Sequence, residues 1–437
     1  MGGMDQPAAS ARLVHDVRAV GLGRATSYQG GALTVAGADA QACFADPSLA
    51  SVSFSWSSPG DPTRIVKVLD AVEPRTAGTG GAGVFPGFLG PAAAHPPRTV
   101  HVLRGAAVVV AGFLPRAQEA VVDMSGPAAA LSPLGATHNL VVEFEPAPAA
   151  PWEDVDVALR RGSLALAVLL ADAALGAPPD AEECFAPAPD PDLAGSDLPA
   201  VAGLTNLQTQ GAFKDVFVGG TSFSGSTPAL LDPAALDAGM IVSGQFGHPS
   251  LKNPTIVHQN SPVVAALRAR HGVDLRFAGL VISPEPVDAA GKERVSAQAA
   301  ELCAAAGFDA VIVTKEGGGN ADGDMALKMD ALEDLGIAAV GLFAEMAGPD
   351  GTGPPIVVPP ERATAMVSTG NYDHRLALPA MERALGGAEL ALLSVPATEA
   401  MELPVAVLYA SLSPLGWGRL TCAGDAGAVT SNGEDVG

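Results

Sequence analysis

The fold class follows from one stretch of the chain, residues 278–343, which read AGLVISPEPVDAAGKERVSAQAAELCAAAGFDAVIVTKEGGGNADGDMALKMDALEDLGIAAVGLF. Three short apolar runs alternate here with two longer segments whose apolar residues recur at helical spacing. The runs are 278–283, 310–314 and 338–343, and the helical segments are 291–306 and 325–335. Apolar strands separated by amphipathic helices are typical of a parallel sheet covered on both faces. We therefore predict an α/β domain with a doubly wound, mostly parallel sheet.

The same alternation continues on both sides of this stretch. Further predicted strands are 239–243 and 363–368, and further predicted helices are 262–271 and 378–385. Together these segments define an α/β domain over residues 200–390. A carboxyl-terminal segment follows at 391–437, where the apolar run 404–412 is expected to add a strand and the last residues have no period.

The amino-terminal part, residues 1–176, is predicted to be a strand-rich α+β domain that ends in a helix. Its strands are expected at 51–56, 99–103 and 106–111, in runs bounded by Gly or Pro. The helix is expected from 152 to 175, with an acidic first turn that suits the positive end of the helix dipole. Residues 177–199 are rich in proline and acid and have no period, which predicts a linker.

Composition excludes several classes of partner. The chain has 437 residues with a net charge of −23 and only 5% aromatic residues, so the basic clusters and stacking platforms of nucleic-acid-binding proteins are absent, and an anionic membrane is an equally poor match. The four cysteines show neither a CxxC pair nor zinc spacing. No secretory signal and no apolar stretch of the about 20 residues that a bilayer span needs is visible. We expect a soluble cytoplasmic protein with reduced thiols.

Polar residues follow each predicted strand of the α/β domain. In open α/β sheets, ligands bind beyond the carboxyl ends of the strands, so these segments are expected to form the site. Most of them also contain glycine, which lets the backbone approach a ligand. The segments are 243–248, 283–285, 315–320, 344–348 and 369–374.

Each of these features also has a structural explanation. The glycines of 316–320 serve a tight turn as readily as a ligand, and they match no dinucleotide or P-loop motif. Asp322 and Asp324 suit a helix start as well as a metal. The histidines at 248, 258 and 374 have no known metal spacing, and Cys303 lies within an apolar helix, where it is expected in the core.

Several ordered motifs carry a resemblance to a known family. The chain resembles the pyruvoyl-type alpha/beta proprotein of component B of glycine, sarcosine and betaine reductases, and more remotely the D-proline reductase proprotein. The resemblance spans nearly the whole chain. Its motifs are GGAGVFPGF (80–88), HVLRGAAV (101–108), DMSGP (123–127), QTQGAFKD (208–215), NPTIVH (253–258), RHG (270–272), KER (292–294) and EGGGN (316–320).

The resemblance implies an oxidoreductase that reductively splits a carbon–heteroatom bond of an amino-acid-like substrate. In that family the proprotein cuts itself at an Asn-Cys pair just after a Ser-Gly, and the cysteine becomes a pyruvoyl group. The ketone of that group captures the substrate amine, and a selenol or thiol of a second subunit attacks the activated carbon.

The matching stretch here reads Ser243-Gly244-Gln245-Phe246. Phe246 has no nucleophile to attack the preceding carbonyl and no heteroatom to eliminate, so the family's cleavage route is chemically closed at this position. Ser243 and Ser250 are nearby hydroxyls, but either would move the scissile bond by several residues. We predict an unprocessed single chain without pyruvoyl and no other cofactor; whether a metal replaces that group is left open.

The leading hypothesis is a diverged reductase-like subunit that acts with a Cys- or Sec-containing second subunit in a hetero-oligomer, on a small amino-acid-like or amine substrate. A non-catalytic scaffold subunit of such a complex and a small-molecule binding module are the alternatives. The expected catalytic residues are His248, Glu316 and His374. Substrate-binding candidates are Gln245, Phe246, Gly317, Asn320, Glu345 and Asn371, and metal-binding candidates are His248, Asp322, Asp324 and His374.

Overall fold

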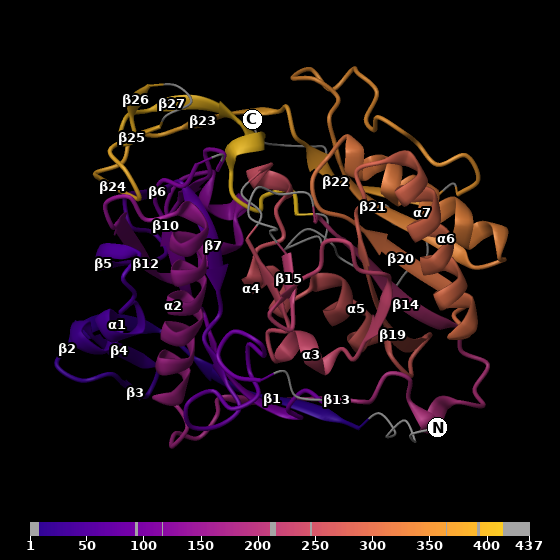
Figure 1. Cartoon of the computed structure of the whole chain (residues 1–437), viewed down its shortest axis with the longest axis horizontal. Coiled ribbons are helices and arrows are strands. Elements are labelled where there is room, and N and C mark those ends of the chain that lie inside the picture. Colours follow the sequence, from indigo (N-terminus) through magenta and orange to yellow (C-terminus); the bar gives the residue numbers. More distant parts are fainter. Residues whose placement is uncertain are drawn as a thin grey trace.

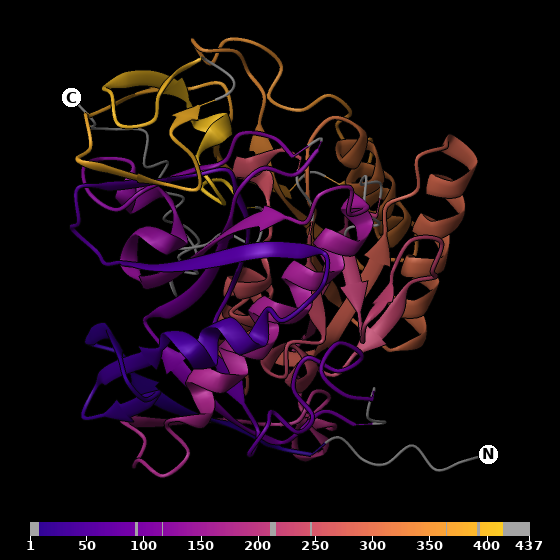
Figure 2. The same ribbon diagram turned by 60° about the vertical axis from the view of Figure 1, so that its left-hand side comes forward.

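The structure is a computed structural model that describes residues 8–91, 95–115, 117–209, 216–244, 247–363, 365–390 and 394–413. Figure 1 shows a strand-rich part, indigo to purple, beside an α/β part, pink to orange. The yellow carboxyl-terminal elements lie over the strand-rich part, as the turned view in Figure 2 also shows. No helix within the described ranges is long and apolar enough to cross a membrane.

The α/β part is organised around a six-stranded sheet in which β17 runs antiparallel at one edge and the other strands are parallel. Helices α6 (Ala289–Ala305) and α7 (Asn320–Asp334) pack on one face, and α5 (Pro262–Arg270) packs on the other. The predicted doubly wound, mostly parallel sheet is therefore confirmed. In spatial order its strands are β17 (Ala229–Leu231), β19 (Arg276–Pro284), β14 (Ala200–Leu207), β20 (Ala310–Thr314), β21 (Ala338–Glu345) and β22 (Ala365–Asn371).

The centre of this sheet is a strand that sequence reasoning missed. In β14, Ala200, Ala202 and Leu204 pack beneath α6 and α7, and Leu207 packs in the core on the α5 side. Alanine and glycine have little intrinsic preference for strands. Burial on both faces, between β19 and β20, therefore determines this strand rather than propensity.

The predicted strand at 239–243 forms, but in a different sheet. β18 (Ile241–Ser243) pairs antiparallel with β15 (Val216–Val218), which also pairs with β16 (Thr221–Ser222). The expectation that this strand joins the parallel sheet was wrong, because a short apolar run does not reveal which strand it will pair with.

Two predictions near the carboxyl end were also wrong. The expected helix at 378–385 is instead the end of β23 (Arg375–Leu378), a turn containing Pro379, and β24 (Arg383–Leu385). The expected strand at 404–412 is mostly turn: β27 (Met401–Pro404) ends where the run begins, and a short 3-10 helix follows. Pro379 disfavours a helix over 378–385. Residues Arg383–Leu385 instead form a strand because they pair with the distant strand β6.

The strand-rich part contains the predicted strands and helix. Its longest helix, α2 (Trp152–Asp172), packs against two sheets around a core of valine, leucine and phenylalanine. One sheet has the order β5 (Leu49–Ser57), β12 (His138–Pro146), β10 (Ala106–Ala111), β7 (Val68–Val72), and the other has the order β13 (Ala181–Phe185), β1 (Ser10–Asp16), β9 (Thr99–Arg104), β8 (Arg75–Thr76).

Shorter elements complete both parts of the chain. They are β2 (Ala19–Gly23), β3 (Ser27–Gln29), β4 (Ala32–Ala36), α1 (Gly37–Cys43), β6 (Thr63–Val66), β11 (Val121–Asp123), α3 (Ala234–Asp237), α4 (Thr255–Gln259), β25 (Glu389–Leu390) and β26 (Val395–Pro396).

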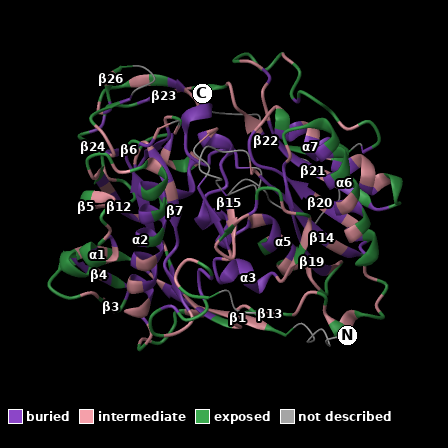
Figure 3. Ribbon diagram, viewed as in Figure 1, coloured by how far each residue is buried: buried purple, intermediate pink, exposed green. Residues whose placement is uncertain are grey.

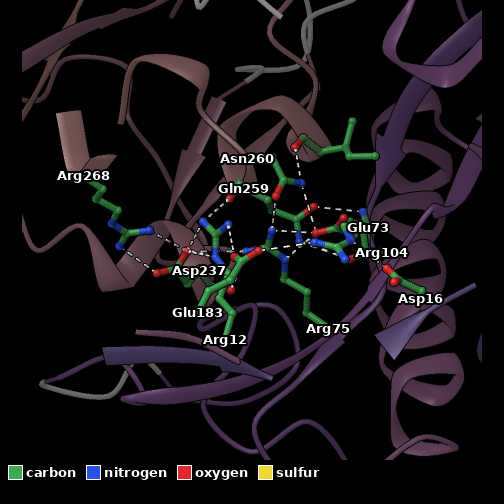
Figure 4. A network of polar contacts seen from close by, with 11 residues as sticks. Arg12, Asp16, Glu73, Arg75, Arg104, Glu183, Asp237, Gln259, Asn260 and Arg268 are labelled. Atoms are coloured by element: carbon green, nitrogen blue, oxygen red, sulfur yellow. Dashed lines mark hydrogen bonds and ion pairs between the residues drawn. The ribbon is translucent and has the colours of Figure 1, made fainter. Parts of the chain in front are cut away.

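Segments that are distant in sequence join the two parts. β13 lies within the predicted linker 177–199 and pairs antiparallel with β1, and β24 pairs in parallel with β6. Figure 4 shows a polar network across the same junction. Its centre is Asp237 of α3, which binds Arg12 (Nε to Oδ1, 2.7 Å) and Arg268 (Nη2 to Oδ2, 2.9 Å).

Arg75 extends this network. Its guanidinium donates to Glu73 (2.6 Å), to Asn260 (2.7 Å) and to the backbone carbonyl of Asp237 (3.0 Å), and all of its side chain is buried. The buried arginines of this network are therefore paired with acidic side chains. Such pairing offsets the cost of burying a charge.

Candidate functional site

The buried carboxylate of Glu316, just after β20, accepts hydrogen bonds from the loop after β14 and from a second loop. Glu316 accepts hydrogen bonds from the backbone N–H groups of Gln208 (3.0 Å) and Asn253 (3.3 Å), and His258 Nε2 lies 3.6 Å from it. Because Glu316 is fully buried, the structure gives it the role of holding three loops in place.

A second buried group, composed of lysines and aspartates, lies where β20 leads into α7. Lys315 forms an ion pair with Asp322 (2.7 Å) and donates to the carbonyl of Gly317 (2.7 Å). Asp324 pairs with Lys292 and lies 3.5 Å from Lys328. Asp322 also accepts from the backbone N–H of Gly319 (3.2 Å). It therefore contributes to the start of α7, the structural role that its position in the sequence allowed.

The metal-binding candidates are not gathered around one point. Asp322 and Asp324 are bound to lysines, and His374 is exposed. Among the residues that the structure describes, no three His, Cys, Asp or Glu side chains are grouped so as to hold a metal ion.

Glu285, just after β19, lies close to this charged group. Burial raises its pKa to about 8, with further contributions from the negative charges of Asp324 and Glu316, while Lys328 and Lys315 oppose the shift. Glu285 is therefore mainly protonated at neutral pH.

A small pocket is lined by residues of α2, β7, β10 and β18. Figure 3 colours the ribbon of α2 and β7 largely as buried. The pocket lies at the end of β18, beside Ser243 and Gly244. Its polar lining includes Asp70 of β7 and Asp156 and Arg160 of α2. Its apolar lining comes from Leu69, Val110, Leu114, Leu159 and Val242.

Hydrogen bonds connect the pocket's acidic residues to the Ser-Gly stretch. Asp70 accepts from both the N–H (3.0 Å) and the hydroxyl (2.6 Å) of Thr255, whose Oγ1 accepts from the N–H of Ser243 (2.9 Å). Burial raises the pKa values of Asp70 and Asp156, and the charge of Lys252 acts in the opposite direction on both.

Arg160 lies directly against the backbone of Gly244. A Cβ added to Gly244 would fall 1.7 Å from both terminal nitrogens of Arg160, so a larger residue here would displace this guanidinium. Arg160 is oriented by Asp156, which accepts from its Nε (2.8 Å), and by the ring of Phe217, whose centroid is 4.9 Å from the guanidinium carbon.

A larger cleft adjoins this pocket and shares Leu114 with it. The cleft lies between the strand-rich part and the carboxyl-terminal segment, and Gln118, Pro249 and Tyr372 line it near His248. The N–H of His248 donates to Gln118 (3.0 Å), and its ring centroid is 6.3 Å from that of Tyr372. Burial lowers the pKa of His248, and the positive charge of Lys315 lowers it further, so the ring is neutral at neutral pH.

The other predicted site residues have mainly local contacts. The Asn371 amide holds the loop after β21: its Oδ1 accepts from Asp373 N–H (3.1 Å) and its Nδ2 donates to the carbonyl of Gly348 (2.8 Å). Asn320 begins α7, Gly317 binds Lys315 through its carbonyl, and the backbone of Glu345 pairs with that of Tyr372. Gln245 and Phe246 lie outside the described residues.

Sequence reasoning missed the residues of the pocket at the Ser-Gly stretch, namely Asp70, Asp156 and Arg160. A signal for them was present. Asp156 and Arg160 are four residues apart on the mostly apolar buried face of α2, and Asp70 interrupts the apolar strand β7. Charged residues in such positions are buried only when paired or functional.

Known proteins resemble this chain along most of its length. A family model described as glycine/sarcosine/betaine reductase component B subunits matches residues 12–403. Component B subunits alpha and beta of the glycine reductase complex of Peptoclostridium acidaminophilum are 34% identical over 385 residues, covering 86% of this chain and 90% of that protein. The alpha subunit of component B of the sarcosine reductase complex of the same organism is 31% identical, covering 78% of this chain and 80% of that protein. The alpha subunit of component B of its betaine reductase complex is 30% identical, covering 85% of this chain and 86% of that protein. No solved structure matches the chain.

Proposed function

The chain belongs to the family of glycine, sarcosine and betaine reductase component B subunits, and from this premise we propose that it is a reductase-like subunit that remains an unprocessed single chain. The observation that carries the proposal is the stretch 243–246. Its Ser-Gly is built into a pocket at the junction of the two parts, and its fourth residue is Phe246.

A pyruvoyl group does not fit this stretch. Forming one requires a side chain with a nucleophilic heteroatom that can later be eliminated, and a benzyl group offers neither. Ser243 itself lies in β18, paired with β15, and its N–H is bound to Thr255. No step of the proposed reaction therefore passes through a ketone on this chain.

We assign the reactive thiol or selenol to a partner subunit. Burial raises the pKa of Cys303 to about 12 and that of Cys43 to about 11, so neither supplies a thiolate at neutral pH. Cys184 lines neither the pocket nor the cleft, and its pKa is also raised. Cys422 lies outside the described residues.

In the proposed reaction, His248 beside the cleft acts as the base, because its neutral ring can accept a proton. It takes the proton of the partner's thiol or selenol. The anion then attacks the substrate carbon that bears the heteroatom and forms a bond to it. The carbon–heteroatom bond breaks with its electron pair on the heteroatom, which takes up a proton.

Reconstitution tests this proposal. The chain is mixed with a Cys- or Sec-containing partner subunit, and release of the amine from glycine, sarcosine or betaine is followed. We expect the amine to be released, at most once per partner subunit, only when both proteins are present, because the substrate carbon stays bound to the partner's sulfur or selenium. His248→Gln should lower the rate of this single turnover by about 100-fold, the usual contribution of a general base. His95→Gln, at an exposed histidine outside the pocket and cleft, is the matched control.

The outcomes separate the alternatives. Equal turnover by the partner alone would overturn the proposal. If turnover needs this chain but His248→Gln keeps full activity, the chain is a scaffold subunit rather than a catalytic one.

A further inference from the structure

The cleft beside His248 continues into a second cleft, and the two share Lys67, Gly112 and Phe113. We call the two together the double cleft. Resting on the proposed function, we propose that the double cleft docks the Cys- or Sec-bearing segment of the partner subunit, and that this segment carries an apolar residue and a basic residue. His248 can take the proton of the partner's thiol or selenol only if that segment reaches it.

The size of the double cleft favours a chain segment over a small molecule. Its two halves have volumes of about 620 Å³ and about 450 Å³. A pocket of about 300–1,000 Å³ encloses a drug-sized molecule. A small amine would therefore occupy only a minor share of this space, whereas a segment of a second protein would fill it.

An exposed aromatic side chain stands where the two halves meet. Phe113 is 63% exposed, and its ring lies edge-on to that of Trp152, with the two centroids 5.8 Å apart. Because Trp152 holds the ring in place, little side-chain freedom is lost when another protein covers it. Aromatic side chains in the centre of an interface are typical anchors of protein binding, so Phe113 is expected to contact the apolar residue of the partner segment.

The loop that carries Phe113 is held at both ends. The N–H of Gly112 donates to the carbonyl of Lys67 (3.0 Å), and Gln118 accepts from the N–H of His248 (3.0 Å). Lys67 and His248 both have left-handed backbone conformations, with φ values of 53° and 48°. This region is unfavourable for residues other than glycine, and such strain is concentrated at functional sites. The double cleft is therefore a preformed surface rather than an accidental gap.

Carboxylates dominate the charge of the double cleft. Glu119 and Asp373 line the first half, and Glu143 and Glu145 line the second. Lys67 is the one base in this lining, within the residues that the structure describes. A lysine or arginine on the partner segment would complement this excess of negative charge, which favours rapid and selective association.

Binding of the full-length chain to the partner subunit tests the docking surface. The reactive Cys or Sec of the partner is replaced by Ser, so that the Kd is measured without chemistry. We expect Phe113→Glu to raise the Kd by at least about 30-fold, the effect of losing a strong interface anchor. Leu22→Glu changes a side chain that is 61% exposed and lies outside both clefts, so it should leave the Kd unchanged.

A second pair of variants tests the charge of the partner segment. Glu145→Lys reverses an exposed charge in the double cleft and should weaken binding by about tenfold. Glu293→Lys makes the same change at an exposed acid of α6, outside both clefts, and should have no effect. Equal Kd values for these two variants would overturn the assignment of a basic residue to the partner segment.

Two results would overturn the docking surface itself: no binding of the partner by the natural chain, or equal Kd values for Phe113→Glu and Leu22→Glu. Failure here is distinguishable from failure of the reductase proposal. Amine release that needs both proteins, with an unchanged Kd in Phe113→Glu, would remove only the docking surface. Binding that depends on Phe113, without amine release in any reconstitution, would remove only the reductase proposal.

Discussion

Residues 243–246 keep the Ser-Gly of the family pattern and carry Gln-Phe at the next two positions. Glycine at position 244 is explained without any processing of the chain, since Arg160 occupies the space where a side chain would lie. Ser243 is likewise used structurally, through its N–H bond to Thr255. The retained pair therefore maintains the shape of the pocket, whether or not the chain is cut.

Glu285 makes the stability of the chain depend on pH. Its pKa rises from 4.5 to about 8 on folding, so the folded state binds the proton more tightly than the unfolded state. Stability contributed by the protonated group is complete below about pH 4.5 and is lost as the pH rises through about 8. We expect the free energy of unfolding of Glu285→Gln to fall less than that of the natural chain between pH 5 and pH 8.

Urea unfolding at a series of pH values measures this difference. Glu293→Gln, at an exposed acid of the neighbouring helix α6, is the control and should follow the natural chain. Parallel pH profiles for the natural chain and Glu285→Gln would contradict the assignment of a raised pKa to Glu285.

At the scale of elements, one short helix adds an ion-pair centre to the strand pairings that join the two parts. α3 places Asp237 between Arg12 and Arg268, with Arg75 bound to its backbone carbonyl. Arg12 belongs to β1 and Arg268 to α5, so this single carboxylate connects the two parts. Its removal takes away the carboxylate that pairs with Arg268 and the closer of the two acidic partners of Arg12.

Asp237→Ala should therefore lower the free energy of unfolding by about 3–5 kcal/mol, the usual cost of breaking a buried ion pair. Asp274→Ala removes the exposed partner of Arg270 and should cost less than about 1 kcal/mol. Chemical denaturation of both variants provides the comparison. Similar losses for the two would mean that Asp237 does not hold the junction.

Elements whose pattern is local could be predicted from the sequence. Helices α6 and α7 and strands β19, β20 and β21 follow from apolar periodicity within the stretch 278–343. β14 and β24 could not, because their partners are distant in sequence and their composition is uninformative. The same reason hid the pocket, since Asp70, Arg160 and Gly244 come from three separate segments. Reasoning from strand ends found Glu316, which is buried and bonded to two loops, and His248, which lies beside the cleft; the catalytic roles predicted for both remain predictions.

For the molecule as a whole, the pocket and the cleft both lie where segments from distant parts of the sequence meet. β24 adds to a strand of the first part, and Leu408 forms a β-bridge with Val121. A functional site at such a junction needs the complete fold to form. We therefore expect the pocket to require both parts of the chain.

The central claim is that the chain works without being cut, and the intact mass of the purified protein under denaturing conditions tests it most directly. The account predicts one species at the full-length mass of 43.6 kDa. Two fragments that sum to this mass, the second starting at Ser243 or Ser250 with a ketone in place of its amine, would contradict it. Pyruvoyl-dependent chemistry would then become the leading explanation of the site.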